Sequence, residues 1–493
     1  MTAPFETANT SRPLRRVVID PVTRVEGHGK VTILLDEDSR VHQVRLHIVE
    51  FRGFEKFIQG RPFWEVPVLV QRLCGICPVS HHLAAGKAVD ALVGVHQLTP
   101  TAEKTRRLLH SGQMLQSHAL HFFHLASPDL LFGFESEPER RNVVGVIGEH
   151  KELAVRGVTL RKFGQEVIRA VAGKRIHGTL CVPGGVNKCI SAADREALRR
   201  ETPQVIRWCQ EAVRVCRDLL DASPHAPIFG LFPSNFMSLI RADGALEFYH
   251  GGLRARDAQG GLIFDHIDTT HYNRYLHEEV KSWSYMKFPF IINLGDEEGW
   301  YRVGPLARVN NCDHIDTVFA EHERQVFRQA ANGGMQHATL MYHWARLIEM
   351  LHAAEDIERL LDDPEIIGTD LIVKGERQLE GVGVIEAPRG TLFHHYRVDE
   401  NDVVTRANLI VSTTNNNQAL NEAVRNVAAS YLDGQRLTEG LLNHIEVAIR
   451  AFDPCLSCAT HALGRMPLQV ELVSADGAVV NRLSKHADGS FEG

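Results

Sequence analysis

The sequence of 493 residues contains no run of about 18 apolar residues, and it therefore predicts no membrane-spanning helix. It also lacks an excess of basic residues, because the formal net charge is −7, which argues against nucleic acid and anionic membranes as partners. Residues 1–13 have no apolar segment of the kind a signal peptide needs, so we expect a flexible arm there and a cytoplasmic protein.

Cysteine is scarce, and two common cofactor-binding motifs are missing. Nine cysteines in so long a chain exclude a disulfide scaffold. No Gly-x-Gly-x-x-Gly segment and no P-loop occur, so the chain itself should bind neither a dinucleotide nor ATP. The cysteines outside two Cys-x-x-Cys pairs show no ferredoxin-like spacing, and Cys209 and Cys216 are expected to be buried core residues on one helix.

Hydrophobic periodicity predicts an α+β fold that is mainly helical, with a large helical bundle core and small peripheral antiparallel sheets. Apolar and polar residues alternate within residues 14–60, which predicts an N-terminal β region. Helical periodicity follows, and Thr99-Pro100 is typical of the cap and first turn of a long buried helix. Residues 244–310, with their Gly-Gly turns, predict a β excursion from the helical body.

The C-terminal third returns to helices and strands. Apolar residues recur every three or four positions between 340 and 357, which predicts a core helix. Strands are expected over residues 384–411, and helices over 416–429 and 438–451. The last helix leads directly into the second cysteine pair.

The two Cys-x-x-Cys pairs are Cys74 with Cys77 and Cys455 with Cys458. Four thiolates from two short loops would form a soft, anionic metal site. A structural zinc site is one reading, although zinc ribbons usually draw both pairs from one short module. A thioredoxin-like dithiol is another, but neither pair lies in a small βαβ unit. Spacing alone leaves these alternatives open.

The residues around the two pairs are more specific. Residues 72–81 read Arg-Leu-Cys-Gly-Ile-Cys-Pro-Val-Ser-His, and residues 453–461 read Asp-Pro-Cys-Leu-Ser-Cys-Ala-Thr-His. Segments 24–28 (Arg-Val-Glu-Gly-His), 52–55 (Arg-Gly-Phe-Glu) and 386–390 (Glu-Ala-Pro-Arg-Gly) occur in the same order. Together these motifs resemble the signatures of the large subunits of nickel–iron hydrogenases. The resemblance spans almost the whole chain and implies that fold, with residues 1–461 as a single domain.

The resemblance implies a nickel–iron centre that cleaves hydrogen reversibly and heterolytically. Cys74 and Cys455 would be terminal nickel ligands, and Cys77 and Cys458 would bridge nickel to an iron that carries CO and two cyanides. Cys455 would accept the first proton, and Glu26 would carry it away. Taken alone, Glu26 would be interpreted as a surface residue in a turn.

Other expected site residues also come from the resemblance. Arg389, in the turn with Pro388, would overhang the open metal position and donate to a cyanide, oriented by Asp453. Thr413 would donate to the second cyanide, although Ser412 replaces the proline of many relatives. Taken alone, Arg389 would be interpreted as half of a surface salt bridge.

Three further residues are expected near the centre. His81 would hydrogen-bond the bridging sulfur. Glu55 and His461 would ligate a buried magnesium ion, although each alone is more often just a satisfied polar residue. Ser117 stands where many relatives have aspartate, which points to the soluble cytoplasmic branch.

The resemblance also implies processing and partners. Residues 462–493 are expected to be a propeptide that an endopeptidase removes after nickel insertion, leaving His461 as the mature C-terminus. The branch that the chain most resembles is bidirectional and reduces NAD. It combines this chain with an iron–sulfur small subunit, and with a diaphorase module that carries FMN, clusters and an NAD site. Two alternatives are a metal-free protein like the quinone-site subunit of complex I, and a zinc-stabilised scaffold.

Overall fold

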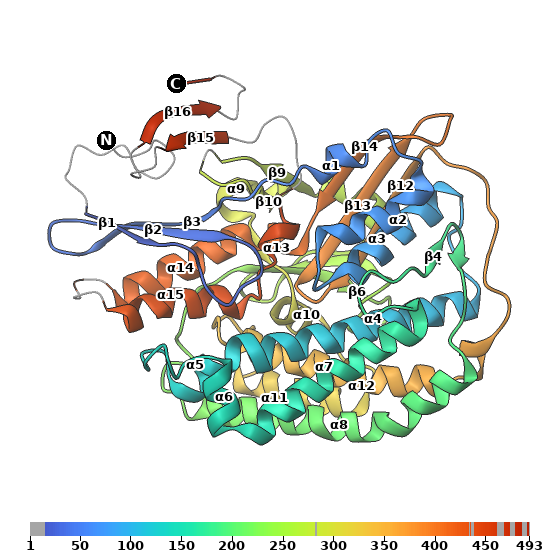
Figure 1. The fold of residues 1–493 in the computed structure, drawn as a ribbon, viewed down its shortest axis with the longest axis horizontal. Coiled ribbons are helices and arrows are strands. Elements are labelled where there is room, and N and C mark those ends of the chain that lie inside the picture. Colours follow the sequence, from blue (N-terminus) through green and yellow to red (C-terminus); the bar gives the residue numbers. More distant parts are fainter. Residues whose placement is uncertain are drawn as a thin grey trace.

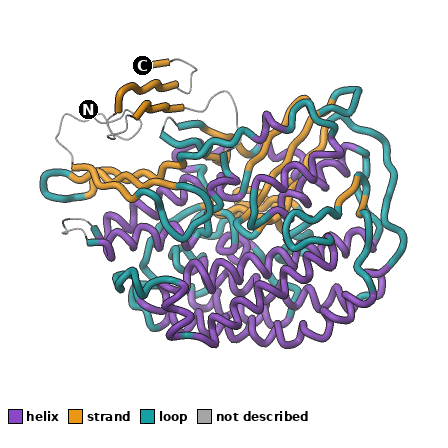
Figure 2. The backbone as a smooth tube through the Cα atoms, viewed as in Figure 1, coloured by secondary structure: helices purple, strands orange, loops and turns teal. Residues whose placement is uncertain are grey.

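The computed structural model describes residues 15–281, 283–432, 434 and 438–460, and the strands 468–473, 479–485 and 491–492. The predicted arm, residues 1–13, and His461 lie outside these residues. Within them, none of the helices is long and apolar enough to cross a lipid bilayer. Figure 1 shows a layer of long helices along one side of the molecule and small sheets along the other, and Figure 2 shows the same division by type.

The helical layer contains the two core helices that periodicity predicted. Its long helices are α4 (Pro100–Leu120), α7 (Lys151–Ala172), α8 (Ala192–Asp221), α11 (Val318–Ala330) and α12 (Met341–Asp362). The Thr99 hydroxyl accepts the N–H of Ala102 at 3.1 Å, which confirms the predicted cap of α4. α12 is buried on almost every side, so apolar residues occupy most of its faces. Cys209 and Cys216 lie buried on α8, as predicted.

The N-terminal sheet is antiparallel. Its strands are β1 (Arg15–Ile19), β2 (Gly29–Leu35) and β3 (Val41–Ile48), paired in sequence order. β3 packs on α14 (Asn417–Tyr431), and α15 (Glu439–Ala451) packs on α14 in turn. This packing brings the N-terminal segment beside the end of the chain's last described helix (Figure 1).

A second antiparallel sheet lies over α3 (Pro78–Leu92). It consists of β12 (Glu380–Ala387), β13 (Gly390–Val398) and β14 (Val404–Ile410). A Cβ atom on Gly383 would lie 2.0 Å from the carbonyl oxygen of Ala84, so glycine is needed for the strand to approach the helix this closely. The β12–β13 turn carries Pro388 and Arg389 toward the start of α3.

The β excursion differs in its limits from the predicted 244–310. Its strands begin at Asn235 and end at Arg302: β6 (Asn235–Ile240), β7 (Gly252–Arg256), β8 (Leu262–Ile267), β9 (Leu276–Glu279), β10 (Phe288–Ile291) and β11 (Tyr301–Arg302). Residues 305–311 form helix α10 (Pro305–Asn311) instead. Pro305 occupies the first helical position, where its missing N–H costs no hydrogen bond, so the chain turns helical there.

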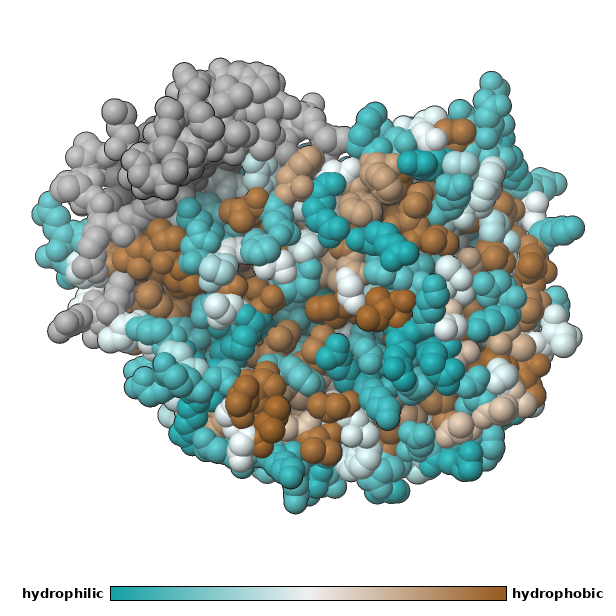
Figure 3. Space-filling view, in the orientation of Figure 1, coloured by the Kyte–Doolittle hydropathy of each residue, from teal (hydrophilic) through white to brown (hydrophobic). Residues whose placement is uncertain are grey.

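The other helices and strands are short. The remaining helices are α1 (Phe54–Phe57), α2 (Val66–Leu69), α5 (Ser127–Phe132), α6 (Val143–Glu149), α9 (Gly295–Glu298) and α13 (Ser412–Asn415). The remaining strands are β4 (Cys181–Val182), β5 (Gly185–Val186), β15 (Leu468–Val473), β16 (Val479–Lys485) and β17 (Phe491–Glu492). Figure 3 shows polar and apolar side chains interspersed over the face drawn.

Candidate metal centre

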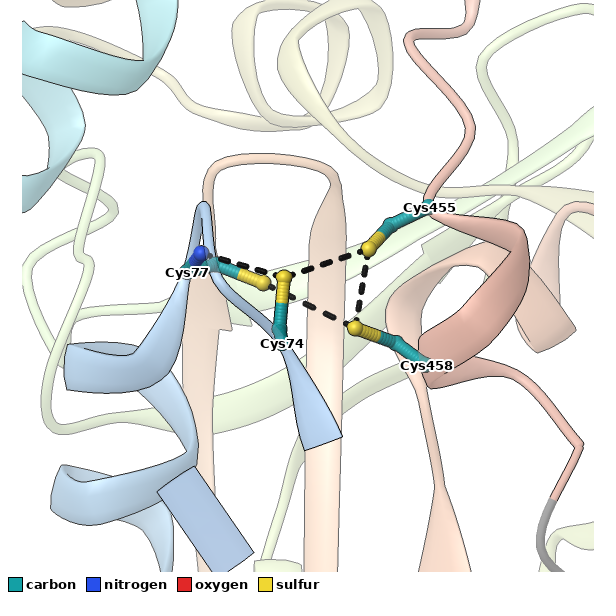
Figure 4. Close-up of side chains that lie close together, drawn as sticks. All are labelled: Cys74, Cys77, Cys455 and Cys458. Atoms are coloured by element: carbon teal, nitrogen blue, oxygen red, sulfur yellow. Dashed lines mark hydrogen bonds between the residues drawn. The ribbon is translucent and has the colours of Figure 1, made fainter. Parts of the chain in front are cut away.

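Four cysteines from opposite ends of the chain meet between the two layers. Their Sγ atoms all lie within 4.8 Å of one another, and all four residues are buried. The separations are 3.3 Å for Cys74–Cys455, 4.0 Å for Cys77–Cys458 and 2.8 Å for Cys455–Cys458. Figure 4 shows the four side chains pointing toward a common centre. We call this group the thiol cluster.

Helix termini place the four sulfurs. Cys77 directly precedes α3, whose first residue, Pro78, favours the start of a helix, and Cys74 follows the 3-10 turn η2 (Val70–Leu73). Cys455 and Cys458 lie on the turn that follows α15. Both pairs therefore sit in short loops held by packed helices, which fixes their positions relative to one another.

The segment around Glu26 docks against the second cysteine pair. Leu456 donates its N–H to the carbonyl of Glu26 at 2.9 Å. Gly27 has a φ of +83°, and a Cβ atom there would lie 2.7 Å from the nitrogen of Ser457. Only glycine allows both this left-handed backbone and this close approach.

The carboxylate of Glu26 contacts the cluster directly. The Cys455 thiol donates to its Oε2 at 3.0 Å, and the N–H of Ser457 donates to the same oxygen at 3.2 Å. The Ser457 hydroxyl donates to Oε1 at 2.5 Å. Glu26 is therefore held by three donors beside a cysteine sulfur.

Arg389 and Asp453 form a buried pair next to the cluster. Arg389 donates from Nε to the carbonyl of Asp453 at 2.5 Å and from Nη2 to its Oδ1 at 3.0 Å. Each residue is 3% exposed. The Nη1 of Arg389 is buried and has no hydrogen-bond partner among the described residues. A buried, unsatisfied guanidinium nitrogen costs free energy, which favours an acceptor at this position.

A small cavity opens on the cluster between these groups. Among the residues that line it are Cys77, His81, Pro388, Arg389, Thr413 and Cys455. The Thr413 hydroxyl accepts the N–H of Cys455 at 3.0 Å and keeps its own proton to donate. A cavity against cysteine sulfurs is unlike a structural zinc site, which has four ligands and no open position.

The negative charge that the thiol cluster carries when it is ionised favours the binding of cations. Burial raises the pKa of Cys455 and of Cys458 well above the ordinary thiol value. Hydrogen bonds from Cys455 and Cys458 hold the pKa of Cys77 well below it. Four adjacent thiolates repel one another, so an ionised cluster needs compensating positive charge. The donor set and its shape fit thiolate-bound metal ions, whose binding displaces the thiol protons.

Arg389 supplies part of the positive charge. Burial alone lowers its pKa, but the negative charge of Asp453 and of ionised Cys455, Cys77 and Cys74 raises it by more. The pKa of Arg389 therefore stands well above its ordinary value, and the side chain stays charged beside the cavity.

The structure brings His81 to the cavity, whereas Glu55 occupies a separate buried position on α1. His81 Nδ1 lies 3.1 Å from Nε2 of His394. Glu55 accepts the N–H of Leu409 at 2.9 Å, and burial raises its pKa. Its expected magnesium partner, His461, lies outside the described residues.

Two contacts of the site had no signal in the sequence. Ser457 was only a variable position between two cysteines, and nothing in its surroundings indicated a hydroxyl bound to Glu26. His394 was one residue of an ordinary strand pattern. Both partnerships depend on segments that are distant in sequence and meet only in the fold.

Comparison with known proteins identifies the family. The nickel-dependent hydrogenase family matches residues 52–131 and 241–461, and the HoxL-like family matches residues 16–51. The chain is 48% identical to the NAD-reducing hydrogenase HoxS subunit beta of Cupriavidus necator, over 96% of this chain and all of the relative. The chain belongs to the nickel-dependent hydrogenase family. It is a large subunit of that family and an oxidoreductase, as the motifs predicted.

Other hydrogenases share the sequence or the fold. The F420-non-reducing hydrogenase vhc of Methanococcus voltae contains a chain that is 38% identical over 92% of this chain and 96% of its own length. A crystal structure of an NAD⁺-reducing nickel–iron hydrogenase in the H2-reduced state superposes with a TM-score of 0.89, at 58% identity over 91% of this chain and 99% of that one. A nickel–iron–selenium hydrogenase from Desulfomicrobium baculatum, at 22% identity and a TM-score of 0.72, shares the fold. The predicted fold class is confirmed.

Proposed function

We propose that this hydrogenase subunit cleaves H2 reversibly and heterolytically at a nickel–iron centre held by the thiol cluster. Cys74 and Cys455 would be terminal nickel ligands, while Cys77 and Cys458 would bridge to an iron carrying one CO and two cyanides. The contact between the Cys455 sulfur and the Glu26 carboxylate, at 3.0 Å, is the observation that carries the proposal. Through it, a carboxylate that can accept a proton touches the sulfur of a proposed nickel ligand.

The residues around the cavity have separate tasks. When bound, the nickel–iron centre supplies Lewis acidity for heterolytic cleavage and takes up the two electrons. The Cys455 sulfur receives the proton, and Glu26 accepts it next, because their hydrogen bond already joins donor and acceptor. Ser457 keeps the carboxylate in place through two hydrogen bonds.

Arg389, Pro388 and Thr413 would bind the diatomic ligands. The free Nη1 of Arg389 and the hydroxyl of Thr413 are donors at the cavity wall, and donors of this kind match cyanide, which is an acceptor. Asp453 would hold Arg389 in position through its carboxylate and its carbonyl. His81, which also lines the cavity, would hydrogen-bond the bridging sulfur.

Electrons must leave through partner proteins. We propose an iron–sulfur small subunit, together with a diaphorase module that has FMN, clusters and an NAD site, and NAD⁺ as the final acceptor. The support is the similarity to one chain of an NAD-reducing hydrogenase and to an NAD⁺-reducing nickel–iron hydrogenase. A cytoplasmic location fits this electron acceptor.

Maturation and magnesium complete the proposal. We propose that nickel-insertion factors load the site and that an endopeptidase then removes residues 462–493. Glu55 and His461 would then bind Mg²⁺. The carbonyl of Thr460 accepts the N–H groups of Arg52 at 3.1 Å and Gly53 at 3.4 Å, so the chain reaches the start of the helix that carries Glu55 one residue before His461.

Metal analysis of the purified complex, with infrared spectroscopy, tests the function. We expect nickel, iron in excess of nickel because the partner subunits carry iron–sulfur clusters, and stretching bands of CO and cyanide from the iron beside the nickel. Zinc in place of nickel would indicate the scaffold alternative, and a fully assembled complex with neither nickel nor zinc would indicate a protein like the quinone-site subunit of complex I. Either result would overturn the proposal.

A further inference from the structure

Helix α12 passes near the Arg389–Asp453 pair and carries two charged residues one turn apart. Arg346 and Glu349 are both 0% exposed. Arg346 contacts the segment that leads into Asp453, and Glu349 reaches the segment that leads into Arg389 through a third residue. Because both come from one rigid helix, their spacing is fixed.

Glu349 acts on the Arg389 side through a third buried residue, Arg308 of α10. Arg308 donates from Nε to Glu349 Oε1 and from Nη2 to Oε2, each at 2.6 Å, so the pair is bidentate. Arg308 Nη1 also donates to Glu386 Oε2 at 2.7 Å. The guanidinium is thus locked between two carboxylates from different elements.

The same guanidinium holds the turn that carries Arg389. Arg308 donates from Nη1 to the carbonyl of Ala387 at 2.9 Å and from Nη2 to that of Pro388 at 3.2 Å. These are the two carbonyls that directly precede Arg389. Gly390 follows Arg389 and has a φ of +132°. A Cβ atom added to Gly390 would lie 2.2 Å from the side chain of Val303, so Val303 limits the position of this backbone.

Arg346 acts on the Asp453 side. It donates from Nη2 to the carbonyl of Ala451 at 3.0 Å and from Nη1 to that of Tyr342, in its own helix, at 3.3 Å. Ala451 ends α15, two residues before Asp453. One helix therefore fixes the backbone on both sides of the pair.

We propose that Arg308, Glu349 and Arg346 are positioning residues that set the placement of the Arg389–Asp453 pair over the thiol cluster. The inference rests on the proposed function, because it concerns where Arg389 presents its free nitrogen to the ligands of the metal centre. Stability alone does not explain such a network, since apolar side chains of similar size in place of a buried ion pair are often neutral or stabilising.

The proposal predicts a spectroscopic effect of Arg308→Lys. Lysine keeps the charge, but it cannot donate to Glu349 through two parallel bonds while holding two carbonyls. We expect the turn to shift, the infrared cyanide bands of the nickel–iron centre to move, and kcat to fall about 10- to 100-fold at unchanged KM for H2, as small misplacements of a catalytic group do.

Arg106→Lys is the matched control. Arg106 is also 0% exposed and pairs with Asp90 at 2.5 Å, but its other bonds go to Tyr249 and to carbonyls of the β4–β5 hairpin. This variant should lower thermal stability while leaving the cyanide bands and the kcat per nickel unchanged. The control therefore distinguishes the effect of losing any buried arginine from the effect of losing the arginine that holds the turn before Arg389.

Arg346→Lys is the second variant, for the case in which Arg308→Lys does not fold. It should move the same bands by displacing Asp453. If metal-loaded Arg308→Lys or Arg346→Lys has the bands and kcat of the wild type, the inference is overturned while the proposed function stands. If the wild type itself lacks nickel and the bands, the proposed function fails instead.

Discussion

At the scale of single residues, the proposed proton route depends on the carboxylate of Glu26, which accepts the Cys455 thiol at 3.0 Å and two hydrogen bonds from Ser457. Glu26, Arg389, Asp453 and Thr413 were expected from the resemblance, and all four lie at the thiol cluster. That Ser457 fixes the Glu26 carboxylate could not be foreseen, because residue type and spacing do not reveal which distant hydroxyl will face a carboxylate.

Glu26→Gln tests the proton route at this scale. Glutamine keeps the shape and can still accept from Ser457, but it cannot take a proton from the Cys455 sulfur. We expect nickel content to be retained and H2 oxidation with an artificial acceptor to fall by about 10²- to 10⁴-fold. Glu37→Gln, in the exposed turn between β2 and β3, is the control and should keep full activity. Unchanged turnover in Glu26→Gln would exclude Glu26 as the proton acceptor.

At the scale of elements, long periodic segments were predictable and their irregular neighbours were not. α4 and α12 follow the predicted helices because many apolar residues repeat at one period. The β excursion was misplaced at both ends, since β6 is a short buried strand and a single proline starts α10. Local patterns of five or six residues do not separate a buried strand from a loop.

Gly27→Ala tests how the Glu26 segment docks on the turn of the second cysteine pair. The added Cβ would meet Ser457 N at 2.7 Å, and φ is +83°, so we expect both backbone strain and separation of Glu26 from Cys455. Gly60→Ala is matched, because Gly60 has a φ of +81° but nothing within 4 Å of the added Cβ. Gly60→Ala should lose about 1 kcal/mol of stability through its positive φ alone, and Gly27→Ala should lose more, because the clash adds to the same strain. Only Gly27→Ala should also lose activity per nickel, and equal activity of the two would show that the close approach is not needed.

At the scale of the whole molecule, the site exists only when both ends of the chain are folded together. Glu26, the first cysteine pair, Arg389 and the second pair come from four separate regions of the sequence. Periodicity could predict the helices and sheets that hold them, but the convergence of four loops depends on tertiary packing. The family resemblance predicted that the four loops converge, because it implies the whole fold of the family, whereas periodicity predicts only single helices and strands.

The proposed removal of residues 462–493 is tested by intact mass. We expect the large subunit of active enzyme to end at His461, and the uncleaved chain to accumulate when nickel is withheld. An engineered chain that stops at His461 is the control for the length of the product. Active, nickel-containing enzyme whose large subunit still carries the tail would contradict the prediction.

Acid should destabilise the folded chain because several buried histidines are neutral. Burial lowers the pKa of His82, His110 and His118 to about 4, and that of His343 to about 3, from 6.5. The unfolded chain binds these protons below pH 6.5 and the folded chain does not, so the stability is complete above pH 6.5 and falls as the pH drops toward 4. Each histidine contributes about 1.4 kcal/mol per pH unit to this loss.

His343→Gln isolates one of these contributions in the free energy of unfolding, measured with urea between pH 8 and pH 5. Glutamine cannot be protonated, so the slope below pH 6.5 should be shallower than that of the wild type by about 1.4 kcal/mol per pH unit. His42→Gln, which replaces an exposed histidine, is the control. Equal slopes for His343→Gln and the wild type would mean that His343 binds its proton equally in both states, and burial would then not hold it neutral.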